Sequence, residues 1–143
     1  MDTSMRWSLF HRRARVLPLA VLVLACAGCG KGQYPVRGTV TLDDGTPVKS
    51  AIVVFESVDA EKPVMARGDT QDDGSYQLST TRPGDGLVPG KYRVLITPRM
   101  ENPDEPVKPA FDTRYADFKT SGLEFEVKAE SNDIPIRLAK AKK

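Results

Sequence analysis

Hydrophobic and polar residues alternate repeatedly along the chain after residue 35. In 36–42, Val36, Val40 and Leu42 fall on one face of an extended chain, and the alternate positions carry Arg or Thr. This period of two is typical of β-strands that bury one face, and no helical period of similar length accompanies it. The alternation predicts seven strands, at 36–42, 51–56, 65–70, 75–79, 91–97, 123–127 and 133–138.

Turn residues separate these predicted strands. Asp43-Asp44-Gly45 and Asp72-Asp73-Gly74 suit tight turns, because Gly adopts a positive φ and Asp accepts hydrogen bonds from its own backbone. We expect each to join neighbouring strands. Pro135 lacks the N–H that an interior strand donates, so 133–138 is expected at a sheet edge. The pattern therefore predicts an all-β fold, a single seven-stranded antiparallel β-sandwich.

The region 98–120 interrupts this rhythm with four prolines and predicts one long loop. Loops of that length in compact domains are commonly functional or disordered. The second half of the region is aromatic-rich and includes Phe111, Tyr115 and Phe118. Two interpretations remain open. These rings, with Tyr34, form a surface that binds a sugar or a peptide, or they pack against the core.

The N-terminal segment has the organisation of a secretory signal. Residues 1–15 carry four Arg and one acidic residue, and the ten residues 16–25 are uncharged. That run is shorter than the about 20 apolar residues of a membrane span. The residues Ala27-Gly28-Cys29 resemble the lipobox of bacterial lipoproteins, in which the Cys receives the lipid and becomes the mature N-terminus. Cys29 is thus the expected lipid-attachment residue. Cys26 is the second candidate, and a cleaved signal peptide without lipid is a further alternative.

This organisation divides the chain into four parts. They are a signal peptide at 1–28, a lipidated Cys with a short tether at 29–34, the sandwich at 35–138 and a basic tail at 139–143. The short tether keeps the domain close to a membrane. Lipoproteins that are retained at the inner membrane often have Asp at the position of Gly30. Gly at this position therefore favours the outer membrane. We expect the basic tail to be solvated, with a contact to anionic lipid as the alternative.

The charges of the chain are nearly balanced, and few reactive groups are present. The net charge of +2 argues against a nucleic-acid partner, because proteins that bind nucleic acids normally have a strongly basic face. After residue 28 there is one Cys and no His, so the imidazole of Ser-His and Cys-His mechanisms and the usual zinc ligands are missing. The Asp pairs at 43–44 and 72–73 offer oxygen ligands for calcium, but turn formation explains them without a metal. We therefore expect no enzyme activity, no cofactor and no metal site.

Five stretches carry a pattern that extends across the predicted sandwich: Gly38-Thr39-Val40, Gly45-Thr46-Pro47-Val48, Ala51-Ile52-Val53-Val54-Phe55, Thr70-Gln71-Asp72-Asp73-Gly74-Ser75-Tyr76-Gln77-Leu78 and Leu87-Val88-Pro89-Gly90-Lys91-Tyr92-Arg93-Val94. Together they resemble carboxypeptidase regulatory-like domains, and 115–123 resembles bacterial lipoproteins that consist of this one domain. The resemblance implies a transthyretin-like (prealbumin-like) sandwich over roughly residues 35 to 138. It does not imply proteolysis, because this sequence contains no peptidase domain. Such sandwiches serve as spacers or as binders of proteins and carbohydrates.

These observations predict a non-enzymatic, lipid-anchored module of the bacterial cell envelope that binds or positions another envelope protein. An exposed unpaired strand would offer a docking place for a strand of that partner. The alternative is a glycan- or cell-wall-binding module that uses Phe111, Tyr115 and Phe118 of the 98–120 loop.

Overall fold

The computed structural model describes residues 32–59, 62–100 and 108–142. Cys26, Cys29 and the rest of the predicted signal peptide lie outside the described residues, as does 101–107 of the long loop. The described chain forms one 3-10 helix and eight strands: β1 (Val36–Leu42), β2 (Ala51–Ser57), β3 (Met65–Asp69), β4 (Ser75–Gln77), β5 (Gly90–Pro98), η1 (Thr113–Ala116), β6 (Leu123–Val127), β7 (Asn132–Asp133) and β8 (Ile136–Leu138). In this part of the chain, no helix is long and apolar enough to cross a bilayer.

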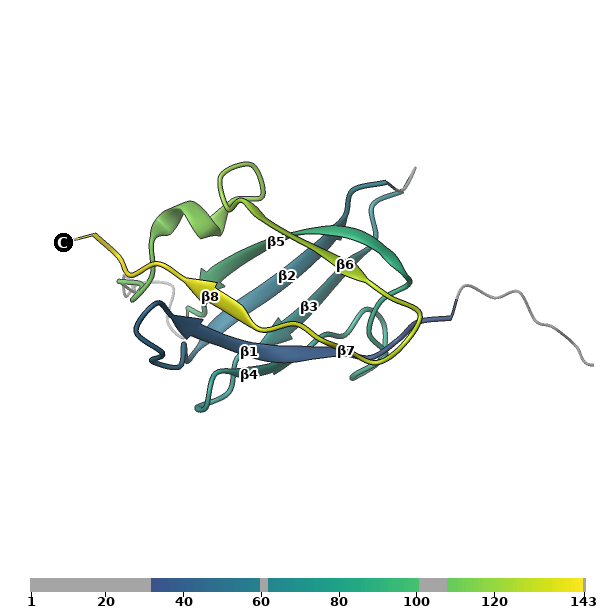
Figure 1. The fold of residues 1–143 in the computed structure, drawn as a ribbon, viewed down its shortest axis with the longest axis horizontal. Coiled ribbons are helices and arrows are strands. Elements are labelled where there is room, and N and C mark those ends of the chain that lie inside the picture. The colour runs from purple at the N-terminus through teal and green to yellow at the C-terminus, as the bar shows by residue number, and fades with distance from the viewer. Residues whose placement is uncertain (1–31, 60–61, 101–107, 143) are drawn as a thin grey trace, which may run out of the picture.

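The strands form two sheets that face each other across a common core (Figure 1). In one sheet, β1 lies between β4, which is antiparallel to it, and the β7–β8 segment, which is parallel to it. The other sheet is antiparallel throughout, in the order β3-β2-β5-β6. The prediction of an all-β sandwich is confirmed.

Two details of the predicted sandwich are wrong. The predicted strand 133–138 is divided into β7 and β8, because Pro135 has no N–H to donate to a ladder. This division gives eight strands in the described part of the chain. Both parts run parallel to β1, so one sheet is of mixed direction. The predicted edge position of this segment is confirmed, since β7 and β8 pair only with β1 among the described strands.

The two Asp-Asp-Gly turns have the predicted local geometry but not the predicted role. Gly45 adopts a φ of 86°, and the Asp44 carboxylate accepts the N–H of Thr46 at 3.0 Å. The 72–74 turn repeats this arrangement. The first turn lies between β1 and β2, and the second between β3 and β4, which are strands of opposite sheets. The expectation that these turns join neighbouring strands is therefore wrong.

Phe55 of β2 lies at the centre of the core. Its side chain is fully buried, and the rings of Tyr76, Tyr92 and Phe125 lie at centroid distances of 6.5, 6.3 and 6.1 Å. These rings come from β4, β5 and β6, so the cluster joins the two sheets. Aromatic pairs at such distances stabilise a core beyond the burial of their area.

The sheet around β1 depends on a close approach at Gly38. The Tyr76 hydroxyl donates to the carbonyl oxygen of Ile134 at 2.7 Å. Burial raises the pKa of Tyr76, and the charge of Asp133 raises it further. A Cβ at Gly38 would lie 2.0 Å from the Ile134 oxygen and 3.1 Å from the Tyr76 ring. Only glycine leaves room here for the chain that joins β7 to β8.

Candidate functional site

The aromatic half of the long loop closes one side of the sandwich. β6 pairs with β5 only as far as Val94, so 95–98 has no strand on that side. The segment 111–121, which includes η1, lies against this part of β5 (Figure 1). Phe111 and Tyr115 are only 2% and 6% exposed and belong to the core. These two rings therefore do not form a binding surface in this structure. They pack in the core, as the second of the two interpretations expects.

Tyr115 is held by polar contacts as well as by burial. Its hydroxyl accepts the N–H of Ala139, which follows β8, at 3.1 Å. The guanidinium of Arg114 donates to the same oxygen at 3.2 Å and lies 5.0 Å from the ring centroid. The loop is thus joined to the C-terminal end of the other sheet.

The predicted basic tail begins inside the sandwich. The backbone of Lys140 pairs with Phe111 in an antiparallel bridge, and the N–H of Ala141 donates to the carbonyl of Ala110 at 3.0 Å. The Lys140 ammonium contacts the Asp44 carboxylate at 2.5 Å and holds the pKa of Asp44 well below its ordinary value. The folded chain therefore continues past residue 138, and the Lys140 side chain pairs with Asp44 while it remains 52% exposed.

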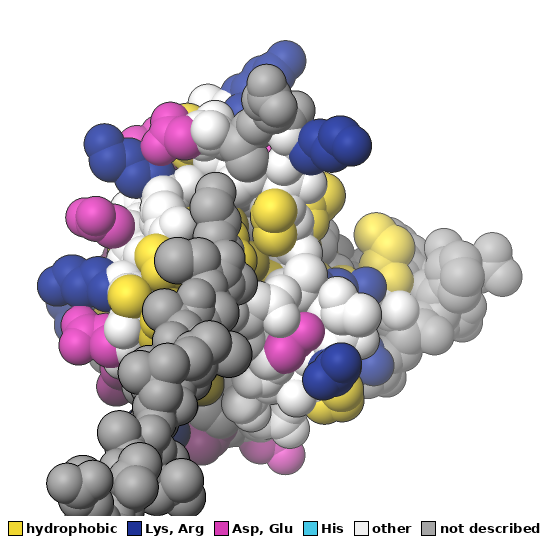
Figure 2. All heavy atoms as spheres, turned by 90° about the vertical axis from the view of Figure 1, so that its right-hand side faces the viewer, with side chains coloured by type: hydrophobic (Ala, Val, Ile, Leu, Met, Phe, Trp, Pro, Cys, Tyr) yellow, Lys and Arg dark blue, Asp and Glu magenta, His cyan; other side chains and the backbone are white. Residues whose placement is uncertain are grey.

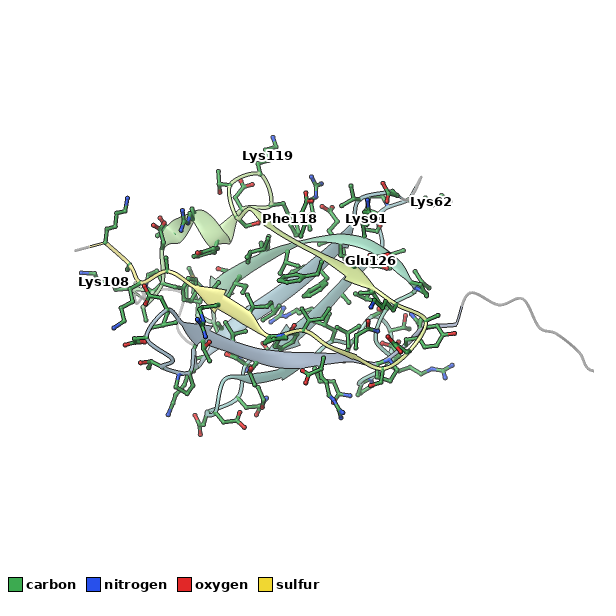
Figure 3. The ribbon with its side chains drawn as sticks, in the orientation of Figure 1. Lys62, Lys91, Lys108, Phe118, Lys119 and Glu126 are labelled. Atoms are coloured by element: carbon green, nitrogen blue, oxygen red, sulfur yellow. The ribbon has the colours of Figure 1, made fainter. Side chains whose placement is uncertain are left out.

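Phe118 is the ring of the 111–118 group that reaches the surface (Figure 3). It is partly exposed, and the guanidinium carbon of Arg93 lies 5.2 Å from its centroid. Arg93 Nε also donates to the Glu56 carboxylate at 2.6 Å, across the β2–β5 pair. Tyr34 is partly exposed as well, but it lies before β1, bridged to Leu87. The structure does not bring the four aromatic residues of the predicted platform together on one surface.

Strand β6 forms an edge of the second sheet. Among the described strands it pairs with β5 on one side and with nothing on the other. Leu123 and Phe125 pack partly buried on the core face, and Glu124 and Glu126 are exposed on the opposite face (Figure 3). Neither carboxylate forms an ion pair with a described side chain. An edge strand leaves alternate N–H and C=O groups without a partner in the sheet.

A hollow of about 550 Å³ lies at the end of the sandwich where the described chain begins. Its walls come from the start of the chain, the β2–β3 connection and the start of β5, and its larger apolar side chains are those of Tyr34, Val64, Val88, Pro89 and Tyr92. Next to it in the chain, Val58 and Met65 are each 50% exposed. Figure 2, which views this end, shows hydrophobic side chains gathered on it with charged ones around them.

Sequence analysis did not identify this hollow. Val58 and Met65 lie at the boundaries of β2 and β3, where the alternation no longer indicates which side is buried. The available signal is the apolar run Pro63-Val64-Met65 where the connection between the predicted strands 51–56 and 65–70 ends, because such a connection usually carries polar residues.

The shifted pKa values have causes in local turns and in burial. Asp85 accepts three backbone N–H groups of 80–82, at 2.7, 2.9 and 2.9 Å, and these bonds lower its pKa. Hydrogen bonds from Ser75 lower the pKa of Asp73, and burial raises the pKa of Tyr92. In the described parts of the chain, no three His, Cys, Asp or Glu side chains are placed to hold a metal ion.

Comparisons with known proteins do not assign this chain to a family. No protein-family model and no curated protein matches it. Among solved structures, (S)-allantoin synthase superimposes with a TM-score of 0.41 and 15% sequence identity, over 78% of this chain and 41% of that protein. The chain thus spans less than half the length of that protein, and similarity at this level supports no conclusion on family or activity. The resemblance to carboxypeptidase regulatory-like domains stays a prediction.

Proposed function

We propose that this protein is a non-enzymatic, lipid-anchored module of the bacterial cell envelope that binds another envelope protein through the edge of β6. The anchor is Cys29, with Cys26 as the second candidate, and the outer membrane is the favoured location. The observation that carries the binding part is the unpaired edge of β6 among the described strands. This edge has partly buried apolar side chains on one face and two exposed carboxylates on the other.

A partner strand at this edge would add a fifth strand to the four-stranded sheet. Its backbone would bond the N–H and C=O groups of β6 that point away from β5. Its apolar side chains would cover Leu123 and Phe125, which keep part of their surface exposed. Phe125 stacks on Phe55 at 6.1 Å, so this cover would continue the core of the sandwich.

Glu124 and Glu126 would make the edge selective. They lie opposite Arg93 and Lys91 of β5, but Arg93 forms its ion pair with Glu56 instead. Pairing with a second copy of β6 would bring like charges together, which is unfavourable. A partner strand with Lys or Arg at its outward-facing positions would be favoured for the same electrostatic reason.

The glycan-binding alternative has less support from the described residues. Of Phe111, Tyr115 and Phe118, only Phe118 keeps appreciable exposed surface, and Arg93 lies over its ring. A platform of several open rings is therefore not formed. Binding to cell-wall glycans becomes the leading possibility only if no protein partner is captured.

The test is a cross-linking pull-down of tagged full-length protein from native membranes, read by mass spectrometry. The edge variant Glu124→Lys/Glu126→Lys reverses two charges on β6. The control variant Asp43→Lys/Asp72→Lys makes the same change in net charge at exposed turn residues outside β6. We expect a near-stoichiometric partner that the wild type and the control variant retain and the edge variant loses, with similar thermal unfolding for all three proteins.

Two results would count against the proposal in different ways. Equal capture by the edge and control variants would contradict docking at β6. Absence of any partner for folded, membrane-bound wild-type protein would contradict the binding function and direct attention to cell-wall glycans.

Anchoring has its own test. Stable anchoring needs more than one acyl chain, so loss of the lipidated residue should release the protein. The variant Cys29→Ala is expected to move from the membrane fraction to the soluble fraction. Continued acylation of this variant would indicate Cys26 instead, and soluble wild-type protein would contradict the anchor.

A further inference from the structure

We infer that the end of the sandwich around Gly32 rests against the surface of the bilayer that holds the anchor, so that the domain stands end-on on the membrane. The inference depends on lipid attachment at Cys29, as proposed above. It adds an orientation and a contact surface, which anchoring alone does not require.

The length of the tether limits how far the domain can be from the lipid. Three residue steps separate Cys29 from Gly32, the first described residue. A fully extended chain spans at most about 3.6 Å per residue, so Gly32 stays within about 11 Å of the lipidated residue. The headgroup region of one leaflet is itself about 5–7 Å thick. The surface around Gly32 therefore lies at or next to the headgroups.

The surface at this end exposes large apolar side chains. Val58 and Met65 are each 50% exposed beside the hollow that Gly32 and Tyr34 help to line. Figure 2 shows that hydrophobic side chains gather on this end of the molecule. Tyr is enriched at the membrane–water interface because its ring is apolar and its hydroxyl is polar. A surface with this composition fits the boundary between headgroups and acyl chains.

Charged side chains of both signs lie at this end. Asp59 and Lys91 line the hollow, and Glu126 lies opposite Lys91 in the β5–β6 pair. Figure 3 places Lys62 and Lys91 toward this end and Lys108 at the opposite end. Because charges of both signs are present, the contact is apolar, and salt should not dissociate it. The contact can be weak, since the tether makes it intramolecular and its effective concentration high.

The end-on orientation is compatible with partner binding at β6. β6 runs along the length of the sandwich, from the loop after η1 toward the Gly32 end (Figure 1). A domain that stands on its Gly32 end would keep the unpaired edge of β6 on its side, where a strand of another protein can reach it.

The test uses single-site fluorescent labels on the lipidated full-length protein in liposomes. Cys29 is the one cysteine after residue 28 and is blocked by the lipid, so a cysteine placed elsewhere takes the label alone. The labelled variants are Val58→Cys and Met65→Cys at the Gly32 end, with Lys108→Cys as the control at the opposite end. The liposomes consist of phosphatidylcholine with a fraction that carries a quencher high in the acyl chain.

We expect several-fold stronger quenching of the labels at 58 and 65 than of the label at 108. The difference should persist between about 0.05 and 0.5 M salt, over which the screening length falls severalfold. Adding Val58→Asp to the Met65→Cys variant should reduce quenching at 65 while the protein remains membrane-bound and folded. Equal quenching at all three positions, in protein that floats with the liposomes, would overturn the contact and leave the anchor intact. Protein that does not float with the liposomes would overturn the anchor and this inference together.

Discussion

Truncation of Tyr115 gives a quantitative test of the position of the aromatic loop. The ring is 6% exposed and fills the side of the sandwich where β5 extends beyond β6. Its hydroxyl also accepts the N–H of Ala139 at 3.1 Å. Tyr115→Ala therefore removes both a packed ring and a link to the chain after β8.

The expected cost follows from these contacts. Replacing a buried aromatic residue by Ala costs about 3–5 kcal/mol of unfolding free energy. In a domain of this size, that corresponds to a fall of at least about 10 °C in Tm. Tyr115→Phe keeps the ring and loses the contact with Ala139, so it should cost about 1 kcal/mol. Phe118→Ala removes a partly exposed ring with a cation–π contact to Arg93 and should cost about 1–2 kcal/mol.

The assay is urea and thermal unfolding of the full-length protein and the three variants, followed by near-ultraviolet circular dichroism. We expect Tyr115→Ala to lose the most stability. Phe118→Ala should lose less, and Tyr115→Phe should lose no more than Phe118→Ala. If Tyr115→Ala unfolds within about 0.5 kcal/mol of the wild type, as surface substitutions do, Tyr115 is not in the core. The ligand-surface interpretation of the loop would then return.

Further predictions concern the β1 sheet and the loop before β5. Gly38→Ala would place a Cβ 2.0 Å from the Ile134 oxygen and should cost about 3 kcal/mol in urea unfolding; an unchanged midpoint would contradict the close approach. Tyr76→Phe loses the 2.7 Å hydrogen bond to Ile134 and should cost about 1–2 kcal/mol by the same assay, and a loss near zero would argue against that bond. The pKa of Asp85 is lower in the folded state than its ordinary value of about 3.9, so its stabilisation is complete above that value and is lost as the pH falls through the folded-state pKa. The stability difference between the wild type and Asp85→Asn should therefore be largest above about pH 5 and shrink toward pH 2, and a difference that grows in acid would refute this sign.

The positions of the strands could be predicted because alternation is a local property. Val36, Val40 and Leu42 face the core in the structure, as their spacing indicates. The partners of each strand could not be predicted in the same way. Alternation fixes which face is buried, whereas pairing depends on the arrangement of both sheets. For this reason the residue pattern predicts that the Asp-Asp-Gly turns join neighbouring strands, whereas in the structure they connect opposite sheets.

The burial of the loop aromatics depends on a difference in strand length. β5 continues to Pro98, but its pairing with β6 ends at Val94, and the space beside 95–98 is covered by the segment that contains Phe111 and Tyr115. The sequence shows an aromatic-rich loop but not the gap that it fills. The residue pattern alone therefore leaves both the core and the ligand-surface interpretations open.

The β6 edge could be predicted in part from the sequence, whereas the apolar end around Gly32 could not. The alternation of 123–127 identified the strand with Glu124 and Glu126 on its outer face, and only the sheet order shows that this strand is an edge. The apolar end around Gly32 is assembled from the start of the chain, the β2–β3 connection and the start of β5. Residues so distant in sequence form one surface only after the chain has folded.

The anchored function and the end-on orientation both depend on lipid attachment at Cys29, and its most direct measurement is the intact mass of the protein extracted from native membranes. We expect a mature chain that begins at Cys29 and carries the added mass of its acyl chains. A mature chain with an unmodified Cys29 thiol, or one that retains residues 1–28, would contradict it. Such a result would remove the basis for both the anchored function and the end-on orientation.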